Sequence, residues 1–98
     1  FSARRARRLG LLSESVTEDE LDSTIDNILS NIIKNGPQAV AKAKALVQWV
    51  SSQEINNEFL SKTSKLIAQV RTSEEGQEGL SAFLEKRSAS WVEMNNDK

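Results

Sequence analysis

Apolar residues recur along this chain at intervals of three and four positions, which is the spacing of one face of an α-helix. The first long run comprises Leu21, Ile25, Ile28, Leu29, Ile32 and Ile33. Thr17 and Glu20 precede it with the spacing of a capping box, in which two side chains bond free backbone N–H groups of the first turn. We therefore predict a helix that starts at Thr17 and ends at Gly36, with Pro37 opening the next helix.

Two further runs show the same period. One comprises Val40, Ala43, Leu46, Val47 and Val50, and the other comprises Ile55, Phe59, Thr63, Leu66, Ile67 and Val70. Between them, Ser51 and Glu54 form a second candidate capping box. The segment "TSEE" at 72–75 is predicted to cap a last helix that reaches about Arg87, because Lys86 and Arg87 suit the negative end of the helix dipole.

The pattern is shorter at the two ends of the chain. "FSARRARRLG" predicts a helix that is capped by Ser2 and stopped by Gly10, followed by a short extended connector. The residues after Ser90 are interpreted as a frayed tail. No segment has the alternating pattern of a strand, so we predict an all-α chain.

Composition narrows the chemistry that this chain can perform. Its 98 residues allow one small domain or a piece of a larger protein, and the helix-like start at Phe1 suggests a piece. The absence of Cys, His and Tyr excludes disulfides, thiol nucleophiles, histidine bases and the usual zinc ligand sets. The net charge of −1 and the lack of a long apolar run argue against nucleic acid and membrane as partners. Without a signal peptide, a cytoplasmic or organelle-matrix location is expected, with the cytoplasm as the default.

Two charged clusters each have a structural and a functional interpretation. The arginines of residues 4–8 could bind phosphate or RNA, but they lack interleaved aromatic residues and more simply form a solvated helix face. The acidic residues of 18–26 could hold a cation, but they lack the glycine turn and oxygen spacing of a calcium loop. Compensation of the helix dipole explains them, and also the glutamates of 74–78. We predict no metal site and no catalytic carboxylate pair.

The aromatic residues also have two interpretations. Trp49 could stack on a ligand, but it lies three residues after Leu46 and is expected on the packed face of its helix. Trp91 follows the last predicted helix and is expected to pin the tail.

Two glycines interrupt the last predicted helix, although each costs roughly 1 kcal/mol relative to alanine in a helix interior. At about 100° per residue, Gly76, Gly79, Phe83 and Lys86 lie along one strip. The glycines could let another helix approach closely, with Phe83 in the core. Alternatively, bare backbone, an aromatic ring and an ammonium group face a long anionic ligand, or the neighbouring subunit that holds one. The residues alone leave both alternatives open.

Three segments resemble the crotonase family of enoyl-CoA hydratases and isomerases. "FSARRARRLGLLSESV" is similar to the stretch where the family leaves its catalytic core, and "NGPQAVAKAKALV" is similar to the proline-led helix that follows. "RTSEEGQEGLSAFLEKRSASW" carries the family's C-terminal pattern of Glu-Gly, Ala-Phe and Glu-Lys-Arg. The form of this last segment resembles bacterial methylglutaconyl-CoA and gamma-carboxygeranoyl-CoA hydratases.

The resemblance implies that this chain is the C-terminal helical, trimerisation region of an α/β crotonase-fold parent. Residues 1–16 would be the tail of the catalytic spiral core, and 17–98 the helical domain. The parent would be an enoyl-CoA hydratase-type hydro-lyase that adds water to a thioester. Its oxyanion hole and acidic residues would lie upstream, so no catalytic residue is expected here. No cofactor is implied beyond coenzyme A as part of the substrate.

In the family, the Phe and Lys of the last motif approach the CoA moiety, often that of an adjacent subunit. The resemblance therefore implies that Phe83 and Lys86 bind substrate. Relatives usually continue with Lys or Arg and then Pro, whereas residues 88–90 are Ser, Ala and Ser here, which weakens the implied phosphate contact. The implied partners are acyl-CoA and further subunits, as a trimer or dimer of trimers, with self-association of the isolated piece. The alternative is a free-standing helical interaction module without catalysis.

Overall fold

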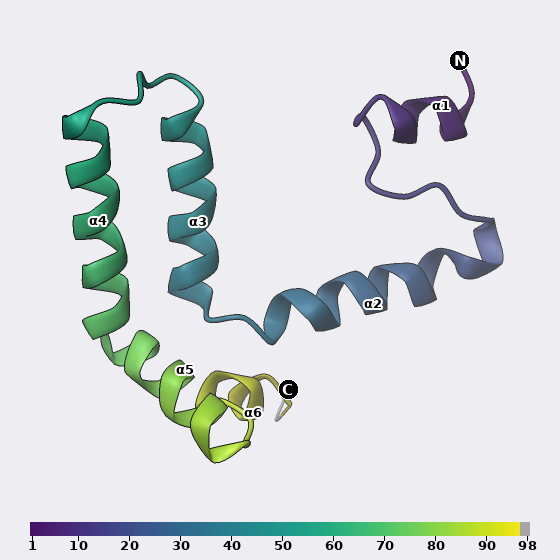
Figure 1. Cartoon of the computed structure of the whole chain (residues 1–98). Coiled ribbons are helices and arrows are strands. Elements are labelled where there is room, and N and C mark those ends of the chain that lie inside the picture. The colour runs from purple at the N-terminus through teal and green to yellow at the C-terminus, as the bar shows by residue number, and fades with distance from the viewer. Residues whose placement is uncertain (97–98) are drawn as a thin grey trace. The chain divides into compact units, whose positions relative to one another are not determined.

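The computed structural model describes residues 1–96, and every element in that range is a helix (Figure 1). In chain order the elements are α1 (Ala3–Arg8), the 3-10 helix η1 (Glu18–Glu20), α2 (Leu21–Ile33), α3 (Pro37–Val50), α4 (Asn57–Thr72), α5 (Glu74–Glu85) and α6 (Ser90–Asn96). The predicted all-α class is confirmed. Two compact units make up the chain, and they divide between residues 31 and 32. The predicted boundary after residue 16 refers to the parent protein and stays a prediction.

The first unit opens with the helix that the sequence predicts. The hydroxyl of Ser2 caps α1 by accepting a hydrogen bond of 3.2 Å from the N–H of Arg5. Gly10 has a φ of 79°, which places it in the left-handed region that favours glycine. The N–H of Leu11 then bonds the carbonyl oxygen of Ala6 at 3.0 Å, so the predicted stop at Gly10 is confirmed.

Thr17 and Glu20 pair at the start of the next helical segment. The Glu20 carboxylate accepts hydrogen bonds from the backbone N–H of Thr17 at 3.4 Å and from its hydroxyl at 2.8 Å. This confirms the predicted pairing. The first turn, η1, is a 3-10 helix, and the α-helical part of the segment begins at Leu21.

The junction between α2 and α3 differs from the prediction at Gly36. Because α2 already ends at Ile33, Gly36 does not cap it. Gly36 is instead the N-cap of α3, with an ordinary φ of −61°, and Pro37 takes the first helical position as predicted.

A carboxylate from α5 supplies the cap that Gly36 lacks. Glu75 accepts hydrogen bonds from the N–H groups of Gln38 at 3.0 Å and Ala39 at 2.8 Å, at the N-terminus of α3. A Cβ at Gly36 would overlap this carboxylate. Gly36 therefore leaves space for the close approach of another side chain, and its backbone angle is ordinary.

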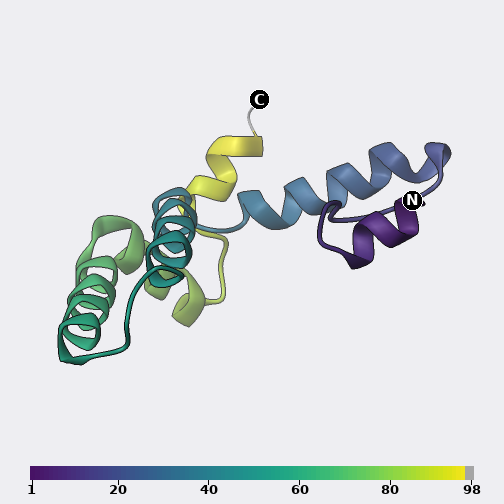
Figure 2. The same cartoon turned by 90° about the horizontal axis from the view of Figure 1, so that it is seen from above.

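Helices α3 and α4 lie side by side and antiparallel (Figures 1 and 2). The predicted capping box of Ser51 and Glu54 is wrong, because α3 continues to Val50 and Ser51 belongs to its final turn. The Ser51 hydroxyl donates to the carbonyl oxygen of Gln48 at 2.8 Å instead of capping a new helix. Asn56 caps α4.

A single residue, Ser73, connects α4 to α5. Its hydroxyl accepts a hydrogen bond of 3.1 Å from the N–H of Gly76, which confirms the predicted cap within "TSEE". Helix α5 ends at Glu85, slightly earlier than the predicted Arg87. The prediction of a frayed tail after Ser90 is wrong within the described range, because α6 begins at that residue.

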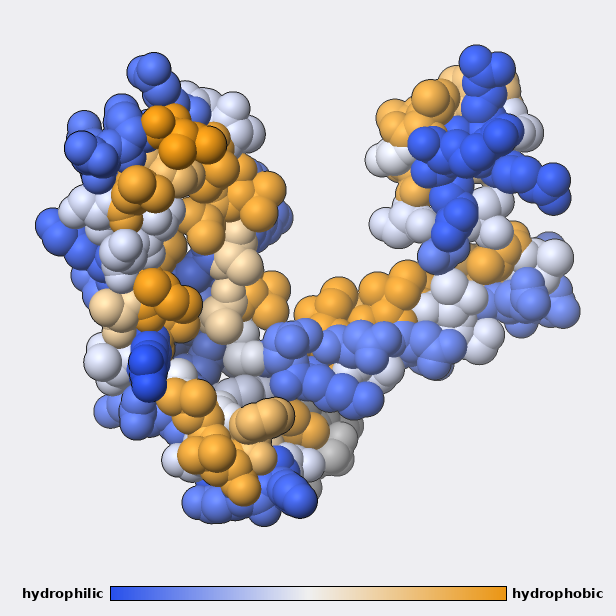
Figure 3. Space-filling view, in the orientation of Figure 1, coloured by the Kyte–Doolittle hydropathy of each residue, from blue (hydrophilic) through white to orange (hydrophobic). Residues whose placement is uncertain are grey.

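Few side chains in this chain are buried. Among the residues whose exposure is described, 1–94, the buried apolar side chains are Ala6, Ala82 and Ala89. The predicted apolar faces do form, but they lie open: Ile25 is 43% exposed and Ile32 is 49% exposed. Figure 3 shows apolar side chains gathered along the visible face of α3 and α4 and on α5. Such stripes normally pack against another element. No helix in the described range is long and apolar enough to cross a membrane.

Candidate functional site

The predicted binding residues lie at the C-terminal end of α5. Phe83 is in the last turn of this helix and is 80% exposed. Lys86 follows the helix directly, is also exposed, and has a left-handed backbone conformation with φ 55° and ψ 41°. The structure therefore presents an aromatic ring and an ammonium group at the same uncovered helix end.

The left-handed turn at Lys86 completes a Schellman motif. The N–H of Arg87 bonds the carbonyl oxygen of Ala82 at 3.0 Å, and the N–H of Lys86 bonds that of Phe83 at 3.3 Å. Glycine is usual at this position because a Cβ is disfavoured there. For a lysine, the conformation costs about 1–2 kcal/mol.

A hydrogen-bonded network surrounds this turn. Glu78, within α5, accepts hydrogen bonds from Nη1 and Nη2 of Arg87 at 2.7 and 3.0 Å and from the N–H of Ser90 at 2.8 Å. The bonds from Arg87, followed by that from Ser90, lower the pKa of Glu78 from 4.5 to about 2. The bond to Glu78 in turn raises the pKa of Arg87. Glu78 is thus held ionised and fully engaged, which makes it unsuitable as a general base.

The two glycines of α5 are covered by other groups, so the interpretation of a bare strip is wrong. A Cβ at Gly76 would overlap the carbonyl oxygen of Val70 near the end of α4. A Cβ at Gly79 would lie 3.3 Å from Cη2 of Trp91. Gly76 therefore permits the tight approach of α4 and α5, and Gly79 makes room for an indole ring. The binding roles of Phe83 and Lys86 do not depend on the glycines and stay predictions.

Trp91 anchors α6, as its position in the sequence suggested. Its indole Nε1 donates a hydrogen bond of 3.1 Å to the carbonyl oxygen of Lys34. Beside the ring lies an open hollow of about 420 Å³. Its lining residues are Ile32, Ile33, Asn35, Pro37, Val40, Trp91 and Met94.

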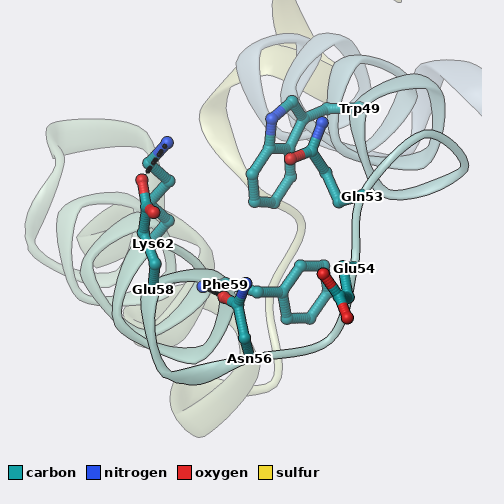
Figure 4. Close-up of a pocket in the computed structure, with 7 residues that line it drawn as sticks. All are labelled: Trp49, Gln53, Glu54, Asn56, Glu58, Phe59 and Lys62. Carbon is teal, nitrogen blue, oxygen red and sulfur yellow. Dashed lines mark hydrogen bonds and ion pairs between the residues drawn. The ribbon is translucent and has the colours of Figure 1, made fainter.

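A second hollow, of about 260 Å³, lies where α3 turns into α4 (Figure 4). The rings of Trp49 and Phe59 stack with their centroids 5.3 Å apart and their planes at 9°. Nζ of Lys62 lies 5.7 Å from the Trp49 centroid and 3.1 Å from Oε1 of Glu58. Trp49 thus packs on a neighbouring helix, as expected. Lys62 and Glu58, which also line this hollow, pair with each other.

Two residues of the charged clusters have partners close by in the sequence. Nε of Arg7 lies 2.8 Å from Oε2 of Glu14, and Glu20 pairs with Thr17 at the start of η1. Within residues 1–96, no group of three or more His, Cys, Asp or Glu could hold a metal ion.

Glu75 and Glu78 have tertiary roles beyond the dipole compensation that the sequence predicts. Glu75 caps α3, and Glu78 binds Arg87 and Ser90. The partners lie 9 to 37 residues away, beyond the helical spacings of three and four that pattern analysis uses.

Comparisons with known proteins match nearly the whole chain. The sequence profile of the family described as enoyl-CoA hydratase/isomerase matches residues 1–94. A crystal structure from Legionella pneumophila, described as an enoyl-CoA hydratase/isomerase (crotonase), superposes with a TM-score of 0.87 at 42% identity. The match covers 93% of this chain and 35% of that chain.

Two curated relatives match over a similar length. The mitochondrial enoyl-CoA hydratase domain-containing protein 3 of Rattus norvegicus is 30% identical over 93% of this chain and 30% of its own length. The methylmalonyl-CoA decarboxylase of Escherichia coli (strain K12) is 29% identical over 94% of this chain and 36% of its own length. The chain thus spans about a third of each relative. Its fold corresponds to the helical C-terminal region of crotonase-fold proteins.

Proposed function

The chain belongs to the enoyl-CoA hydratase/isomerase family, and on that premise we propose that it is the C-terminal helical part of an enzyme that processes acyl-CoA thioesters. In this proposal the reaction is the addition of water to an enoyl-CoA. From the form of residues 75–87, the substrate is methylglutaconyl-CoA or carboxygeranoyl-CoA. We place the enzyme in the cytoplasm.

The observation that carries the proposal is the exposed pair of Phe83 and Lys86 at the end of α5. The Phe83 ring is 80% exposed, and Lys86 forms no ion pair with any residue that the structure describes. An ammonium group is a suitable point charge for a phosphate, and an open aromatic face can cover the adenosine or pantetheine part of coenzyme A. We propose that these two residues contact the CoA moiety, in this subunit or in a neighbouring one.

The second part of the proposal is a role in assembly. The open apolar faces of α2, α3, α4 and α5 need covering, and we assign part of that cover to a trimer or dimer of trimers and the rest to the catalytic core.

Substitution of Lys86 in the enzyme that carries this chain tests the binding role. Lys86→Gly removes the ammonium group while keeping the left-handed turn, since glycine adopts that conformation without strain. A partly exposed charge-assisted contact contributes about 1–2 kcal/mol, so KM for the acyl-CoA should rise roughly five- to thirty-fold. Uniform binding of this kind leaves kcat nearly unchanged, because the contact is the same in the ground and transition states.

The control is Lys44→Ala, which removes the same charge from an exposed position on α3. It should leave KM unchanged. If Lys86→Gly and Lys44→Ala both give the parent KM in a correctly assembled enzyme, Lys86 is not a CoA contact.

A free-standing helical interaction module is the alternative function, and the open apolar faces are the observation that favours it. Purification of the native protein distinguishes the two. The enzyme proposal expects this chain to be continuous with a catalytic domain and to turn over an enoyl-CoA. A native 98-residue protein that binds a partner without acyl-CoA turnover would support the module instead.

Decarboxylation is a second candidate reaction, since one relative is named a methylmalonyl-CoA decarboxylase. Product analysis with an enoyl-CoA and with a carboxylated acyl-CoA separates it from hydration.

A further inference from the structure

Lys86 is unusual because its backbone conformation is one that glycine would adopt without strain. In the described part of the chain, Lys86 is the non-glycine residue that has a positive φ. A side chain is retained there at a cost of about 1–2 kcal/mol, so the surrounding structure has to hold the turn in place.

Arg87 supplies that support. Its guanidinium group bonds both carboxylate oxygens of Glu78, at 2.7 and 3.0 Å, and donates from Nη1 to the carbonyl oxygen of Ser88 at 3.1 Å. Its backbone N–H closes the Schellman motif on Ala82. The residue that follows Lys86 is therefore fixed to α5 through both its backbone and its side chain.

Glu78 extends the same support to the far side of the turn. Besides Arg87, it accepts the N–H of Ser90 at 2.8 Å, which is the first residue of α6. One carboxylate thus connects α5, the turn and α6.

The same contacts pair Arg87, rather than its neighbour Lys86, with the nearby carboxylates. Nε of Arg87 also binds Oε2 of Glu85 at 2.7 Å, so Arg87 engages the carboxylates of both Glu78 and Glu85. A guanidinium fork binds carboxylates more strongly and with better geometry than an ammonium group does. Lys86, which lies between Glu85 and Arg87, forms no ion pair within residues 1–96.

We infer that the Glu78–Arg87 pair is a positioning device, which holds Lys86 in its left-handed turn and keeps nearby carboxylates away from its ammonium group, so that this group is available for a phosphate of the CoA moiety. The inference rests on the proposed function, because it assumes that Lys86 contacts CoA. Glu78 and Arg87 act through Lys86 and do not themselves touch the substrate.

A double-mutant cycle in the enzyme that carries this chain tests the inference. Glu78→Gln leaves Arg87 with a weaker partner, so the turn that holds Lys86 is fixed less firmly. We expect KM for the acyl-CoA to rise about three- to ten-fold with kcat within about twofold of the parent. In the Lys86→Gly background, the same substitution should have no further effect on KM, because the positioned group is already absent.

A truncated substrate adds a second measurement. The corresponding acyl-pantetheine thioester lacks the nucleotide phosphates, so its KM should be the same in the parent, Glu78→Gln and Lys86→Gly enzymes. A general loss of structure would raise KM for both substrates.

Two further variants keep the test decisive. Arg87→Lys retains the charge but loses the fork, and it should raise KM for acyl-CoA in the same direction if Glu78→Gln does not assemble. Glu58→Gln breaks the surface ion pair of Glu58 with Lys62 and serves as the matched control, with no expected effect.

The outcomes distinguish the proposed CoA contact of Lys86 from the proposed positioning role of Glu78 and Arg87. If Lys86→Gly leaves KM for acyl-CoA unchanged, the proposed CoA contact is overturned, and the positioning role falls with it. If Lys86→Gly raises KM but Glu78→Gln and Arg87→Lys do not, the contact stands and the positioning role is overturned. The positioning role is also overturned if Glu78→Gln raises KM equally in the presence and absence of Lys86.

Discussion

The indole N–H of Trp91 donates a hydrogen bond of 3.1 Å to the carbonyl oxygen of Lys34, which lies 57 residues earlier in the chain. Lys34 directly follows α2, and the last carbonyl groups of a helix have no partner within it. Trp91 satisfies one of these groups from α6 while its ring covers Gly79 of α5. A single side chain therefore connects three helical segments.

Trp91→Phe should loosen α6. The variant keeps an aromatic ring over Gly79 but loses the donor to Lys34, and a hydrogen bond of this kind contributes about 0.5–1.5 kcal/mol. We expect amide hydrogen exchange in α6 to become roughly two- to ten-fold faster. Trp49→Phe is the control, because the contacts of Trp49 are with the Phe59 ring and Lys62. Equal exchange of α6 in both variants would show that the hydrogen bond to Lys34 does not hold this helix.

Glu75→Ala should destabilise the start of α3. The carboxylate caps two N–H groups of that helix, and the loss of a helix cap costs about 0.5–2 kcal/mol. Glu74→Ala is a closely matched comparison, since Glu74 lies in the same first turn of α5 and is exposed. Both variants lose the favourable interaction with the α5 dipole, so faster exchange of the Ala39 amide should appear with Glu75→Ala alone. Faster exchange of that amide in both variants would contradict the capping role.

Gly76→Ala and Gly79→Ala should change the stability of the protein by different amounts. At Gly76 a methyl group meets the backbone carbonyl of Val70, which cannot move without separating α4 from α5, and overpacking of this kind costs about 1–3 kcal/mol. At Gly79 the methyl group meets the edge of the Trp91 ring at 3.3 Å, which can shift by a few tenths of an ångström. The helix also gains about 1 kcal/mol from alanine, so this variant should be close to neutral. Thermal melts of the two variants measure the difference, and a Gly76→Ala protein as stable as the parent would contradict the close contact.

The bond between Glu78 and Arg87 should make the junction of α5 and α6 sensitive to strong acid. The pKa of Glu78 is lowered from 4.5 to about 2, chiefly by its hydrogen bonds to Arg87. A lowered folded-state pKa means that the stabilisation is complete above the unfolded value near 4.5 and is lost as the pH falls through about 2. Titration of the Glu78 carboxyl carbon by NMR should give a midpoint near 2 rather than 4.5.

The Arg87→Gln variant is the control for this titration. It removes the largest cause of the shift, so the midpoint of Glu78 should move back toward 4.5. An unchanged midpoint would assign the shift to the Ser90 N–H instead.

The sequence by itself determined the all-α class and most helix starts. Ser2, Thr17 with Glu20, Pro37 and Ser73 mark helix beginnings where they were expected. Each acts on backbone groups within three residues, or through its own fixed φ, so the local sequence contains all the required information. The resemblance in 75–87 likewise needed only the residues of that segment.

Only the tertiary structure determined which contacts the side chains of those helices make. The space beside Gly36 is filled by the carboxylate of Glu75 from α5, and the space beside Gly79 is filled by the ring of Trp91 from α6. The hydrogen bonds that connect Arg87 to Glu78 lie directly after the left-handed turn at Lys86. Together with the bond of Trp91 to Lys34, these contacts join residues 9 to 57 positions apart, and a helical period of 3.6 residues carries no information over such separations. The periodic faces were predicted correctly. Burial of such a face requires a partner surface, which the pattern of one helix does not specify. The apolar faces of this chain lie open because no partner surface covers them within the part that the structure describes.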